Sequence, residues 1–344
     1  MYNSFVAAKG LVACQHYIGV DIIYIVMSRR SNDQGRAYEF ISLLILGKEI
    51  SEIRPATIIK NSSYTAAENA WNTLSEEDKN KYTISAKAAV KRIFDLEPRI
   101  IEDGTDEIEL FIQPDQQGEQ GDVRDILIVR RKIAWEIGLS LKHNHFAVKH
   151  SRLSKTIDFG QAWYDIPCSK DYWSEVLPVF EYLTEEKAKG AKFSDLPSKE
   201  NDVYVPILNA FINEINKQYD TNKEIPSKLV EYLLGKFDFY KVISIDNKRL
   251  TSIQGFNLHG TLNQEGVTKL KPSIEVPLVS LPTRIVKLDF VPGSTNKVEL
   301  YMDEGWQFTF RIHNAATKVE PSLKFDIQIV GMPTAIITIN CIWD

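Results

Sequence analysis

A carboxylate and an ammonium group occur on two successive stretches of the chain that are both typical of β-strands. Asp125 begins the first stretch, which ends at Arg130, and Lys142 ends the second, which begins at Ala134. Mg²⁺ binds oxygen ligands, usually one or two carboxylates with water and phosphate. The bound ion polarises a phosphate and acidifies a water, while a nearby ammonium orients that water and offsets negative charge. The pair therefore has the composition needed for metal-assisted cleavage of a phosphodiester.

The alternation of the second stretch assigns its two faces. The residues that point towards a core are Trp135, Ile137, Leu139 and Leu141, and those that point the other way are Glu136, Gly138, Ser140 and Lys142. If the turn centres near 131–132, Asp125 lies opposite Gly138, and Ser140 is its diagonal neighbour at about 7–8 Å. A slip of one residue would move Asp125 to the wrong face. Taken alone, this spacing also fits a surface hairpin with solvated charges.

The pair resembles the PD-(D/E)XK nuclease core, with Asp125 as the first acid and Lys142 as the lysine. The sequence departs from that pattern twice, because Arg124 replaces the proline before Asp125 and Ser140 occupies the position of the second acid. Serine is a poor Mg²⁺ ligand, so a second carboxylate has to come from elsewhere. Some restriction enzymes of this superfamily carry serine there and recruit a glutamate from another position.

The candidates for that second carboxylate are Glu39, Glu136 and Asp122. Glu136 lies about 13 Å along the strand from Ser140, so it is close only to the far side of Asp125. Glu39 interrupts an apolar helix, where an unpaired carboxylate would cost several kcal/mol. It also matches a glutamate that many such nucleases place on their first helix, and we rank it first. A buried salt bridge to an arginine is the alternative.

Longer strings of this sequence resemble the HaeIII-type restriction endonucleases over roughly 28–335. They are 35–40 (GRAYEF), 135–154 (WEIGLSLKHNHFAVKHSRLS), 256–261 (FNLHGT), 305–314 (GWQFTFRIHN) and 320–326 (EPSLKFD). The resemblance implies Mg²⁺-dependent hydrolysis of duplex DNA at GGCC, between G and C, which leaves 5′-phosphate ends. It also implies a cognate cytosine methyltransferase as a genetic companion. A palindromic site invites a homodimer but does not require one.

A basic block follows an acidic stretch in the middle of the chain. Residues 95–122 carry ten acids and one base, whereas 124–155 carry eight Lys/Arg, two acids and three histidines. Such a block can neutralise DNA phosphates although the whole chain has a net charge of −5. The side chains expected to contact phosphates or guanines are His143, His145, Lys149, His150 and Arg152. A solvated loop is the alternative, and the adjacent letters HNH at 143–145 do not meet the geometry of an HNH nuclease.

Two basic residues of the C-terminal half are candidates to read bases. Arg311 and His313 alternate with Thr309 on one face of an expected strand. Arginine reads guanine through O6 and N7 in the major groove. Phosphate contact or plain solubility is the alternative for each, since half or more of protein–DNA hydrogen bonds go to the backbone.

The expected fold is mixed α/β (α+β), with a PD-(D/E)XK nuclease-like core followed by a β-rich C-terminal half. Helices are expected over 35–49, 65–96 (as two), 171–187, 203–219 and 226–235, and strands over 107–113, 125–130, 134–142 and repeatedly from 237 onwards. We divide the chain into an N-terminal extension (1–26), a helix-rich nuclease core (27–236) with the catalytic hairpin 122–142, and a β-rich region (237–344) for DNA recognition.

The first 26 residues end in an apolar run, 18–26, that is nine residues long. This run is too short to span a membrane and lacks the pattern of a secretory signal. We expect Met27 to be the biological start and 1–26 to be translated upstream sequence, with a genuine N-terminal strand as the alternative. The three cysteines, Cys14, Cys168 and Cys341, are far apart and odd in number, which favours a reducing, intracellular setting. The resemblance to restriction endonucleases implies that this setting is the cytoplasm of a prokaryotic cell.

Two other functions fit parts of the sequence. Pro167-Cys168 resembles the nucleophile motif of cytosine-C5 methyltransferases, but the Phe-x-Gly-x-Gly loop and the Glu-Asn-Val partner are missing. Cys168 alternatively reads as a buried small apolar residue. A DNA-binding component without nuclease activity would need the basic face but not the Asp-Lys pair, so cleavage with and without Mg²⁺ separates it from a nuclease.

Overall fold

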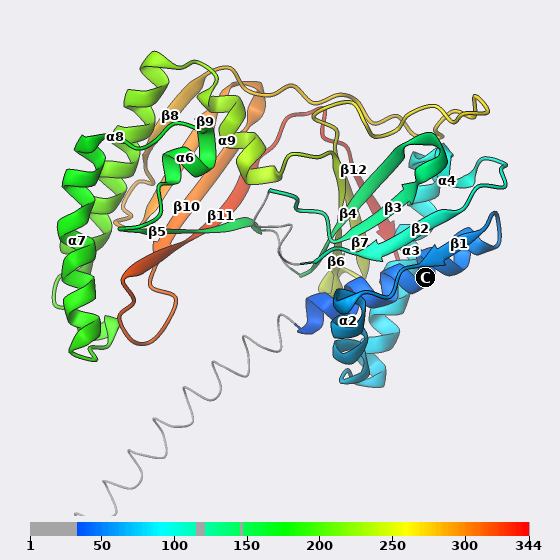
Figure 1. The fold of residues 1–344 in the computed structure, drawn as a ribbon, viewed down its shortest axis with the longest axis horizontal. Helices are drawn as coiled ribbons and strands as arrows, with labels where there is room; N and C mark the ends of the chain where they lie inside the picture. Colours follow the sequence, from blue (N-terminus) through cyan, green and yellow to red (C-terminus); the bar gives the residue numbers. More distant parts are fainter. Residues whose placement is uncertain (1–32, 115–120, 145–146, 344) are drawn as a thin grey trace, which may run out of the picture.

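The computed structural model describes residues 33–114, 121–144 and 147–343, which form two lobes around two β-sheets (Figure 1). The expected extension 1–26, the start at Met27 and the candidate His145 lie outside the described residues. The mixed α+β class expected from the sequence, with a β-rich C-terminal half, is confirmed.

The larger sheet has seven strands in the order β1-β2-β3-β4-β6-β7-β12. They are β1 (Ala56–Ile58), β2 (Ile108–Ile112), β3 (Ile126–Arg130), β4 (Trp135–His143), β6 (Phe239–Ile245), β7 (Leu250–Phe256) and β12 (Thr338–Ile342). β4 runs parallel to β6 but antiparallel to β3, so β3 and β4 form the expected hairpin in the middle of the sheet.

Four helices of the described residues accompany this sheet. They are a helix over 33–51, α2 (Ser62–Asn72), α3 (Glu76–Leu96) and α4 (Pro98–Ile101). Asn61 and Ser75 cap α2 and α3 by accepting hydrogen bonds from backbone N–H groups of the first turn. The helices expected over 35–49 and within 65–96 are confirmed. Pro98 does not only end α3, because it also begins α4, where a missing N–H costs nothing.

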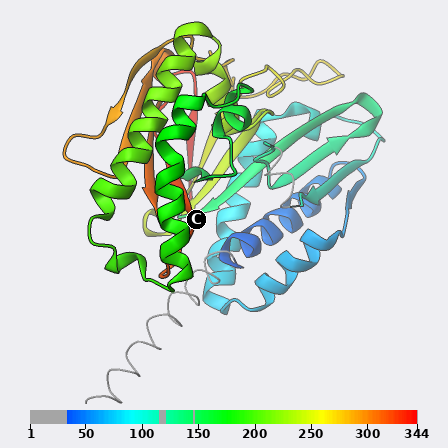
Figure 2. The same ribbon diagram turned by 60° about the vertical axis from the view of Figure 1, so that its left-hand side comes forward.

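The smaller sheet has five strands in the order β5-β11-β10-β9-β8. They are β5 (Ala147–Ser154), β11 (Ser322–Gly331), β10 (Gln307–His313), β9 (Lys297–Met302) and β8 (Ile285–Phe290). One face is covered by α6 (Phe159–Tyr164), α7 (Lys170–Ala188), α8 (Val205–Thr221) and α9 (Ile225–Leu234), as Figure 2 shows. Phe211 of α8 lies 5.6 Å from Phe310 and 5.2 Å from Phe325 between ring centroids, which anchors the helices on the sheet.

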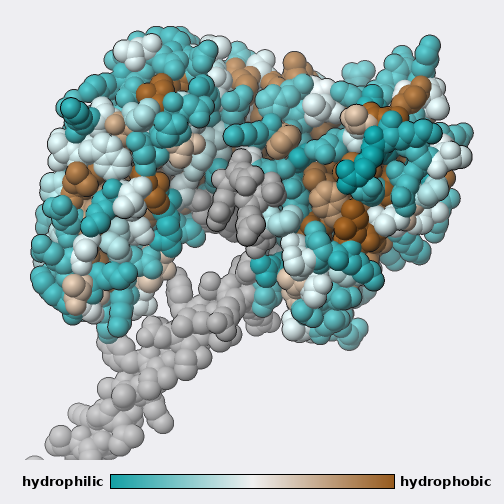
Figure 3. Space-filling model, in the orientation of Figure 1, coloured by the Kyte–Doolittle hydropathy of each residue, from teal (hydrophilic) through white to brown (hydrophobic). Residues whose placement is uncertain are grey.

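The chain crosses between the two lobes more than once. β5 leaves the first lobe directly after β4, and β6, β7 and β12 return to complete the seven-stranded sheet. The boundary between the sheets therefore does not coincide with the expected boundary near residue 236. The end of the β3–β4 hairpin that carries Lys142 lies towards the second lobe, because β5 follows β4 almost directly, and the turn of the hairpin points away from it. Figure 3 shows a notch between the two lobes.

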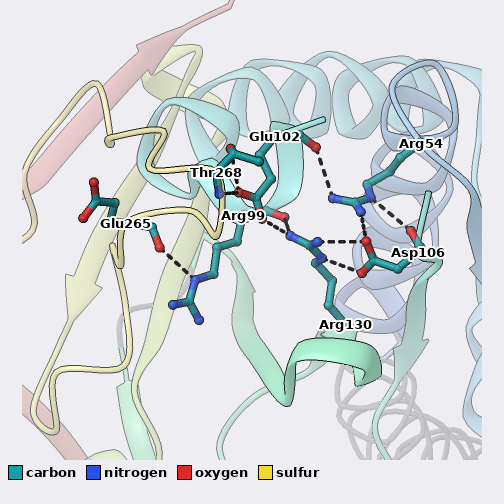
Figure 4. A network of polar contacts seen from close by, with 7 residues as sticks. All are labelled: Arg54, Arg99, Glu102, Asp106, Arg130, Glu265 and Thr268. Atoms are coloured by element: carbon teal, nitrogen blue, oxygen red, sulfur yellow. Dashed lines mark hydrogen bonds and ion pairs between the residues drawn. The ribbon is translucent and has the colours of Figure 1, made fainter. Parts of the chain in front are cut away.

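A buried network of ion pairs closes the far end of the larger sheet (Figure 4). Arg130, at the end of β3, binds Asp106 through Nε and Nη2, each at 2.9 Å, and also pairs with Glu102. Arg54 pairs with Asp106 from the end of the first helix. Glu102 in turn accepts hydrogen bonds from Thr268 at 3.0 and 3.1 Å. The network ties the N-terminal helices to the long irregular segment 257–284.

A second buried carboxylate holds the same irregular segment. Glu97 is fully buried, and its Oε1 accepts hydrogen bonds from the hydroxyl of Tyr240 at 2.6 Å and from the backbone N–H of Asn263 at 2.7 Å. Its Oε2 has no hydrogen-bond partner among the described residues. Burial raises the pKa of Glu97 to about 7, although both hydrogen bonds act to lower it. The carboxyl group therefore binds its proton more tightly in the folded than in the unfolded chain.

This shift makes the stability of the fold depend on pH. The folded pKa is raised, so the contribution of Glu97 is fully present below its unfolded pKa and is lost as pH rises through about 7. Glu97→Gln is expected to remove this dependence and to be more stable than wild type above pH 7. Urea unfolding at pH 5, 6, 7 and 8 measures it, with Glu265→Gln, an exposed carboxylate of the irregular segment, as the control. Parallel pH curves for wild type and Glu97→Gln would contradict this expectation.

Candidate active site

The hairpin turn sets the register of the site. Residues 131–134 connect β3 to β4, and Ala134 has a left-handed backbone with φ of 50°. The turn therefore centres one residue later than expected, and the β3–β4 ladder places Asp125 opposite Ser140. The prediction that Gly138 lies opposite Asp125 is therefore wrong by two residues along β4. A shift of two keeps every side chain on its face, so Asp125 still lies on the polar side of the sheet.

The carboxylate of Asp125 is held by three donors, all at Oδ2. The backbone N–H of Leu141 lies at 2.6 Å, the ammonium of Lys142 at 3.1 Å and the hydroxyl of Ser140 at 3.3 Å. No hydrogen bond to Oδ1 occurs among the residues that the structure describes. The side chain of Asp125 is 24% exposed, so its carboxylate is oriented by the protein and still reaches solvent.

Lys142 remains a cation in this setting. Burial acts to lower its pKa, but the negative charges of Asp125 and Glu39 and the hydrogen bond to Asp125 outweigh burial and raise the pKa. Of the three acids expected to help Asp125, Glu39 is thus the one whose charge acts on Lys142. It comes from the helix over 33–51 and lines a pocket of about 290 Å³ together with Arg36.

The other two expected helpers are held by Arg124. Its guanidinium binds both carboxylate oxygens of the buried Asp122 at 2.8 Å and reaches Glu136 at 2.8 Å. The pKa of Asp122 is lowered, because the hydrogen bonds from Arg124 and Gln113 outweigh the opposite effect of burial. Asp122 and Glu136 therefore neutralise an arginine, whereas Asp125 faces Lys142.

The position of the Arg124 side chain also explains why residue 138 is a glycine. The side chain of Arg124 lies across Gly138, where a Cβ would clash with its Cδ and Cγ, and its guanidinium stacks 4.1 Å from the ring of Phe237. A proline in the position of Arg124 could not make these contacts. The departure from the superfamily pattern thus has a structural counterpart in this hairpin.

Removing this arginine is expected to cost stability. Arg124→Met leaves the buried Asp122 without its partner, and breaking a buried ion pair costs about 3–5 kcal/mol. Arg131→Met is the matched control, because Arg131 lies on the same hairpin, pairs with Glu109 and is 66% exposed. It should cost less than about 1 kcal/mol. Chemical unfolding measures the free energy of unfolding of both variants. An equal decrease for both would show that the ion pairs of Arg124 stabilise the fold no more than an exposed ion pair does.

A lysine that the sequence analysis missed stands beside the hairpin. The ladder aligns Ser140 with Lys241 of β6 and Lys241 with Gln254 of β7, so these side chains share the face of Asp125. Lys241 is only 4% exposed. Burial and the charge of Lys142 lower its pKa to about 8, against the opposite effect of Asp125. The signal in the sequence is a lysine within a largely apolar strand, FYKVISI.

The histidine after Lys142 is enclosed by its neighbours. His143 contacts the carboxylate of Asp246 through Nε2 at 2.9 Å and the hydroxyl of Tyr82 through Nδ1 at 3.1 Å. The Tyr82 ring lies 4.6 Å from the imidazole between centroids. The imidazole thus links the end of β4 to the β6–β7 turn and to α3.

Lys149 points towards the helices of the second lobe. Its Nζ donates to the backbone oxygen of Tyr232 at 2.9 Å and lies 3.7 Å from the centre of that ring. Burial and the charge of Lys236 lower its pKa to about 8. It lines a pocket of about 350 Å³ together with Lys228 and Lys236, next to Gly121 at the start of the hairpin segment.

Arg152, Arg311 and His313 lie on the polar face of the five-stranded sheet. Arg311 and His313 both pair with Asp326 of β11, at 2.6 and 3.1 Å. Arg152 pairs with Glu320 at 3.0 Å. The backbone of His150 pairs with Asp326 in the β5–β11 ladder, but its side chain lies outside the described part of the chain. The structure gathers Arg311 and His313 as expected, on a different sheet from Asp125.

Comparisons with known proteins identify the family of this chain. The family model described as HaeIII restriction endonuclease matches residues 35–333. The curated Type II restriction enzyme HaeIII of Haemophilus aegyptius is 55% identical over 319 residues, which are 92% of this chain and 100% of that protein. The chain belongs to the HaeIII restriction endonuclease family. No solved structure matches it.

Family membership decides between the functions considered above. The protein is a type II restriction endonuclease, a site-specific deoxyribonuclease, and not a methyltransferase. Cys168 agrees with this, because its thiol is buried, accepts the N–H of Gly160 at 3.3 Å and has a pKa raised by burial. A raised pKa suppresses the thiolate that a nucleophile needs. None of the helices in the described ranges is long and apolar enough to cross a membrane.

Proposed function

We propose that this endonuclease cuts duplex DNA at GGCC, between G and C, in a Mg²⁺-dependent reaction that leaves 5′-phosphate ends. The observation that carries the proposal is the contact of Asp125 with Lys142 at 3.1 Å in a chain closely related to the HaeIII enzyme. The expected partners are duplex DNA with this site and a cytosine methyltransferase that protects the host. A homodimer is compatible with the palindrome, and a restriction enzyme has its substrate inside a prokaryotic cell.

The carboxylate oxygens of Asp125 are suitable ligands for Mg²⁺. This ion favours one or two carboxylates and keeps several waters, and Asp125 offers an oriented carboxylate whose Oδ1 has no described partner. No group of three or more His, Cys, Asp or Glu side chains occurs among the described residues, which suits a site that the DNA phosphate completes. When bound, Mg²⁺ would polarise the scissile phosphate and acidify a water.

The side chains of the hairpin supply the remaining functions. Lys142 is a cation within reach of Asp125, so its ammonium is placed to orient the attacking water and to offset charge on the phosphate. Ser140 orients the carboxylate of Asp125 by donating to Oδ2. Asp122 is the weaker candidate ligand, because a metal would first have to displace Arg124 from both of its oxygens.

We assign the second carboxylate to Glu39, in line with its effect on Lys142. Glu39→Gln is therefore expected to lower the cleavage rate in Mg²⁺ about a hundredfold or more. Glu136→Gln should leave the rate nearly unchanged, because Glu136 faces Arg124 and is 45% exposed. Single-turnover cleavage of a GGCC duplex measures both. Full activity of Glu39→Gln with an inactive Glu136→Gln would reverse the assignment.

The DNA contacts are assigned to the basic side chains that follow the hairpin in the sequence and to those of β10. We assign phosphate or base contacts to His143, His145, Lys149, His150, Arg152, Arg311 and His313, and base recognition to the β-rich region 237–344. Arg311 and His313 already pair with Asp326, so they would exchange that carboxylate for a phosphate or a guanine edge. Their truncation should weaken binding without changing the chemistry of cleavage.

A cleavage assay tests the proposed function. Two duplexes that differ only in GGCC or a scrambled site are incubated with Mg²⁺ or with EDTA, and the ends are mapped and ligated. Cleavage of the GGCC duplex alone, only with Mg²⁺ and with ligatable 5′-phosphate ends, is expected. Equal cutting of both duplexes, or cutting in EDTA, would refute the proposal.

A further inference from the structure

A basic pocket lies between the helices of the second lobe and the start of the hairpin segment. It has a volume of about 350 Å³ and is lined from β5, α6 and α9. Its charged lining residues are Lys149, Lys228, Lys236, Asp165 and Glu231. Gly121 also lines it and comes four residues before Asp125, so the pocket begins within about 14 Å of the proposed metal ligand.

The ammonium of Lys149 is fixed by α9 but keeps further donors. Its Nζ donates to the backbone oxygen of Tyr232, in the last turn of α9, at 2.9 Å and lies 3.7 Å from the centre of that ring. A cation is favoured at the C-terminal end of a helix, so this contact has a structural role. An ammonium has three N–H groups, and the described residues accept a hydrogen bond from one of them. Two donors of a partly buried cation are therefore left for a ligand.

Lys236 brings a second ammonium group to the same pocket. Its charge lowers the pKa of Lys149, as burial also does, so the two cations lie within electrostatic range of one another. The side chain of Lys236 runs along Gly121, where a Cβ would lie 3.4 Å from its Cε. Within the described ranges, the ammonium of Lys236 makes no hydrogen bond or ion pair. The repulsion between the two cations is thus not balanced by an ion pair of either side chain.

The carboxylates of the pocket do not cancel both of these cations. Asp165 pairs with Lys228 at 3.3 Å, and each neutralises the other. The remaining charges are two positive ones, on Lys149 and Lys236, and one negative one, on Glu231. Neither carboxylate contributes to the pKa shift of Lys149, on which only the charge of Lys236 acts. A phosphodiester carries one negative charge and would balance the pocket.

The aromatic wall of the pocket favours a phosphate over a base. Tyr232 stacks on Trp163 at 4.8 Å between ring centroids, with an angle of 18° between the rings, and the ammonium of Lys149 lies over the Tyr232 ring. Trp163 itself is only 4% exposed. A base that is turned out of the duplex would need an open ring face on which to stack. The pocket provides N–H donors and positive charge, which bind phosphate oxygens.

We propose that this pocket binds a backbone phosphate of the DNA close to the scissile phosphodiester, with Lys149 and Lys236 donating to its non-bridging oxygens. The inference rests on the proposed function and adds Lys236 and a defined phosphate subsite to it. Each strand of a duplex carries one phosphate per 3.4 Å of axis, so about 14 Å corresponds to a phosphate within about four nucleotides of the cut. The contact positions the duplex on the hairpin and reads no base.

Neutralising one phosphate at a time tests this contact. A series of GGCC duplexes carries a methylphosphonate at a single position, from one to four nucleotides on either side of the cut, and fluorescence anisotropy in EDTA measures the affinity of each. Wild type should lose about tenfold at the contacted position. Lys236→Met should bind the unmodified duplex about tenfold more weakly and lose nothing further at that position. At the other positions it should lose as much as wild type does.

Matched variants separate this contact from a general effect of charge. Lys223→Met removes an exposed lysine before the other end of α9 and should behave as wild type on every duplex. Lys236→Arg keeps the charge and should restore part of the affinity. Lys149→Met should be insensitive at the same position as Lys236→Met. The slope of log affinity against log salt concentration should become shallower by about 1 for Lys236→Met and stay unchanged for Lys223→Met.

Two results would overturn the inference. If Lys236→Met keeps the wild-type loss at every position, Lys236 contacts no single phosphate of the DNA. If calorimetry shows binding of inorganic phosphate that depends on Lys236, without a position-specific effect on DNA, the pocket takes a free anion instead. If wild type does not prefer GGCC over a scrambled duplex, the proposed function itself fails. The first two results leave that preference intact, so the failures are distinguishable.

Discussion

Replacing Asp125 by alanine is expected to abolish cleavage at GGCC while leaving binding to that site largely intact. Asp125 is the carboxylate whose Oδ2 is fixed by Leu141, Lys142 and Ser140, and its removal would eliminate the main oxygen ligand that we propose for the metal. Losing a metal-bound nucleophile costs several kcal/mol of transition-state stabilisation, which is a factor of about 10³ or more in rate.

The affinity of Asp125→Ala for DNA should not fall together with its cleavage rate. A carboxylate beside the scissile phosphate repels it when no metal intervenes, so Asp125→Ala is expected to bind a GGCC duplex in EDTA as tightly as wild type or more tightly. Asp125→Asn keeps the shape of the side chain and should also be inactive. Asp103→Ala, which removes an exposed acid, is the control with wild-type cleavage. Wild-type cleavage by Asp125→Ala would contradict the assignment and direct attention to Asp122.

Lys142→Ala is expected to slow cleavage about 10²- to 10³-fold with a much smaller effect on binding. The ammonium contacts Asp125 at 3.1 Å and remains charged, so under the proposed function we expect it to act on the water and the phosphate. General acid–base and electrostatic groups of this kind typically contribute such factors. Arginine at this position should not restore the rate fully, because its planar guanidinium differs in shape from an ammonium.

Lys132→Ala is the matched control for Lys142. Lys132 lies on the turn of the same hairpin and is exposed, so its removal changes the charge of the hairpin without touching the site. Single-turnover rates in Mg²⁺ and dissociation constants in EDTA are measured for both variants. Equal rates for Lys142→Ala and Lys132→Ala would show that the ammonium of Lys142 has no part in the chemistry.

The parts of this site that follow local patterns could be predicted from the sequence. The strict alternation in 134–142 assigns Ser140 and Lys142 to one face, and an apolar run with capping residues indicates the helix that carries Glu39. The register of the hairpin could not be predicted to the residue, because the backbone conformation of Ala134 determines where the turn ends. The predicted face of the sheet is still correct, because the register differs by an even number of residues.

The parts that depend on long-range pairing could not be predicted. Lys241 lies beside Ser140 only because β6 adds to β4 in parallel after the chain has formed β5 and the helices α6 to α9. The ion pairs of Arg124 with Asp122 and Glu136 depend on the path of the Arg124 side chain over Gly138. The alternation of polar and apolar residues contains no information on either contact. The sequence therefore offers three candidates for the second carboxylate, whereas in the structure Arg124 binds Asp122 and Glu136 but not Glu39.

The most direct test of the central claim is to locate a divalent ion in the protein bound to a GGCC duplex. Anomalous scattering from Mn²⁺, measured on crystals of the wild-type protein with a duplex that carries a methylene group in place of each leaving 3′-oxygen so that the DNA stays intact, gives the position of the ion. The ion is expected on Asp125 at about 2.1–2.2 Å from a carboxylate oxygen, with the scissile phosphate beside it. An ion on Asp122 in place of Arg124, or no ion near β3 and β4, would contradict the account.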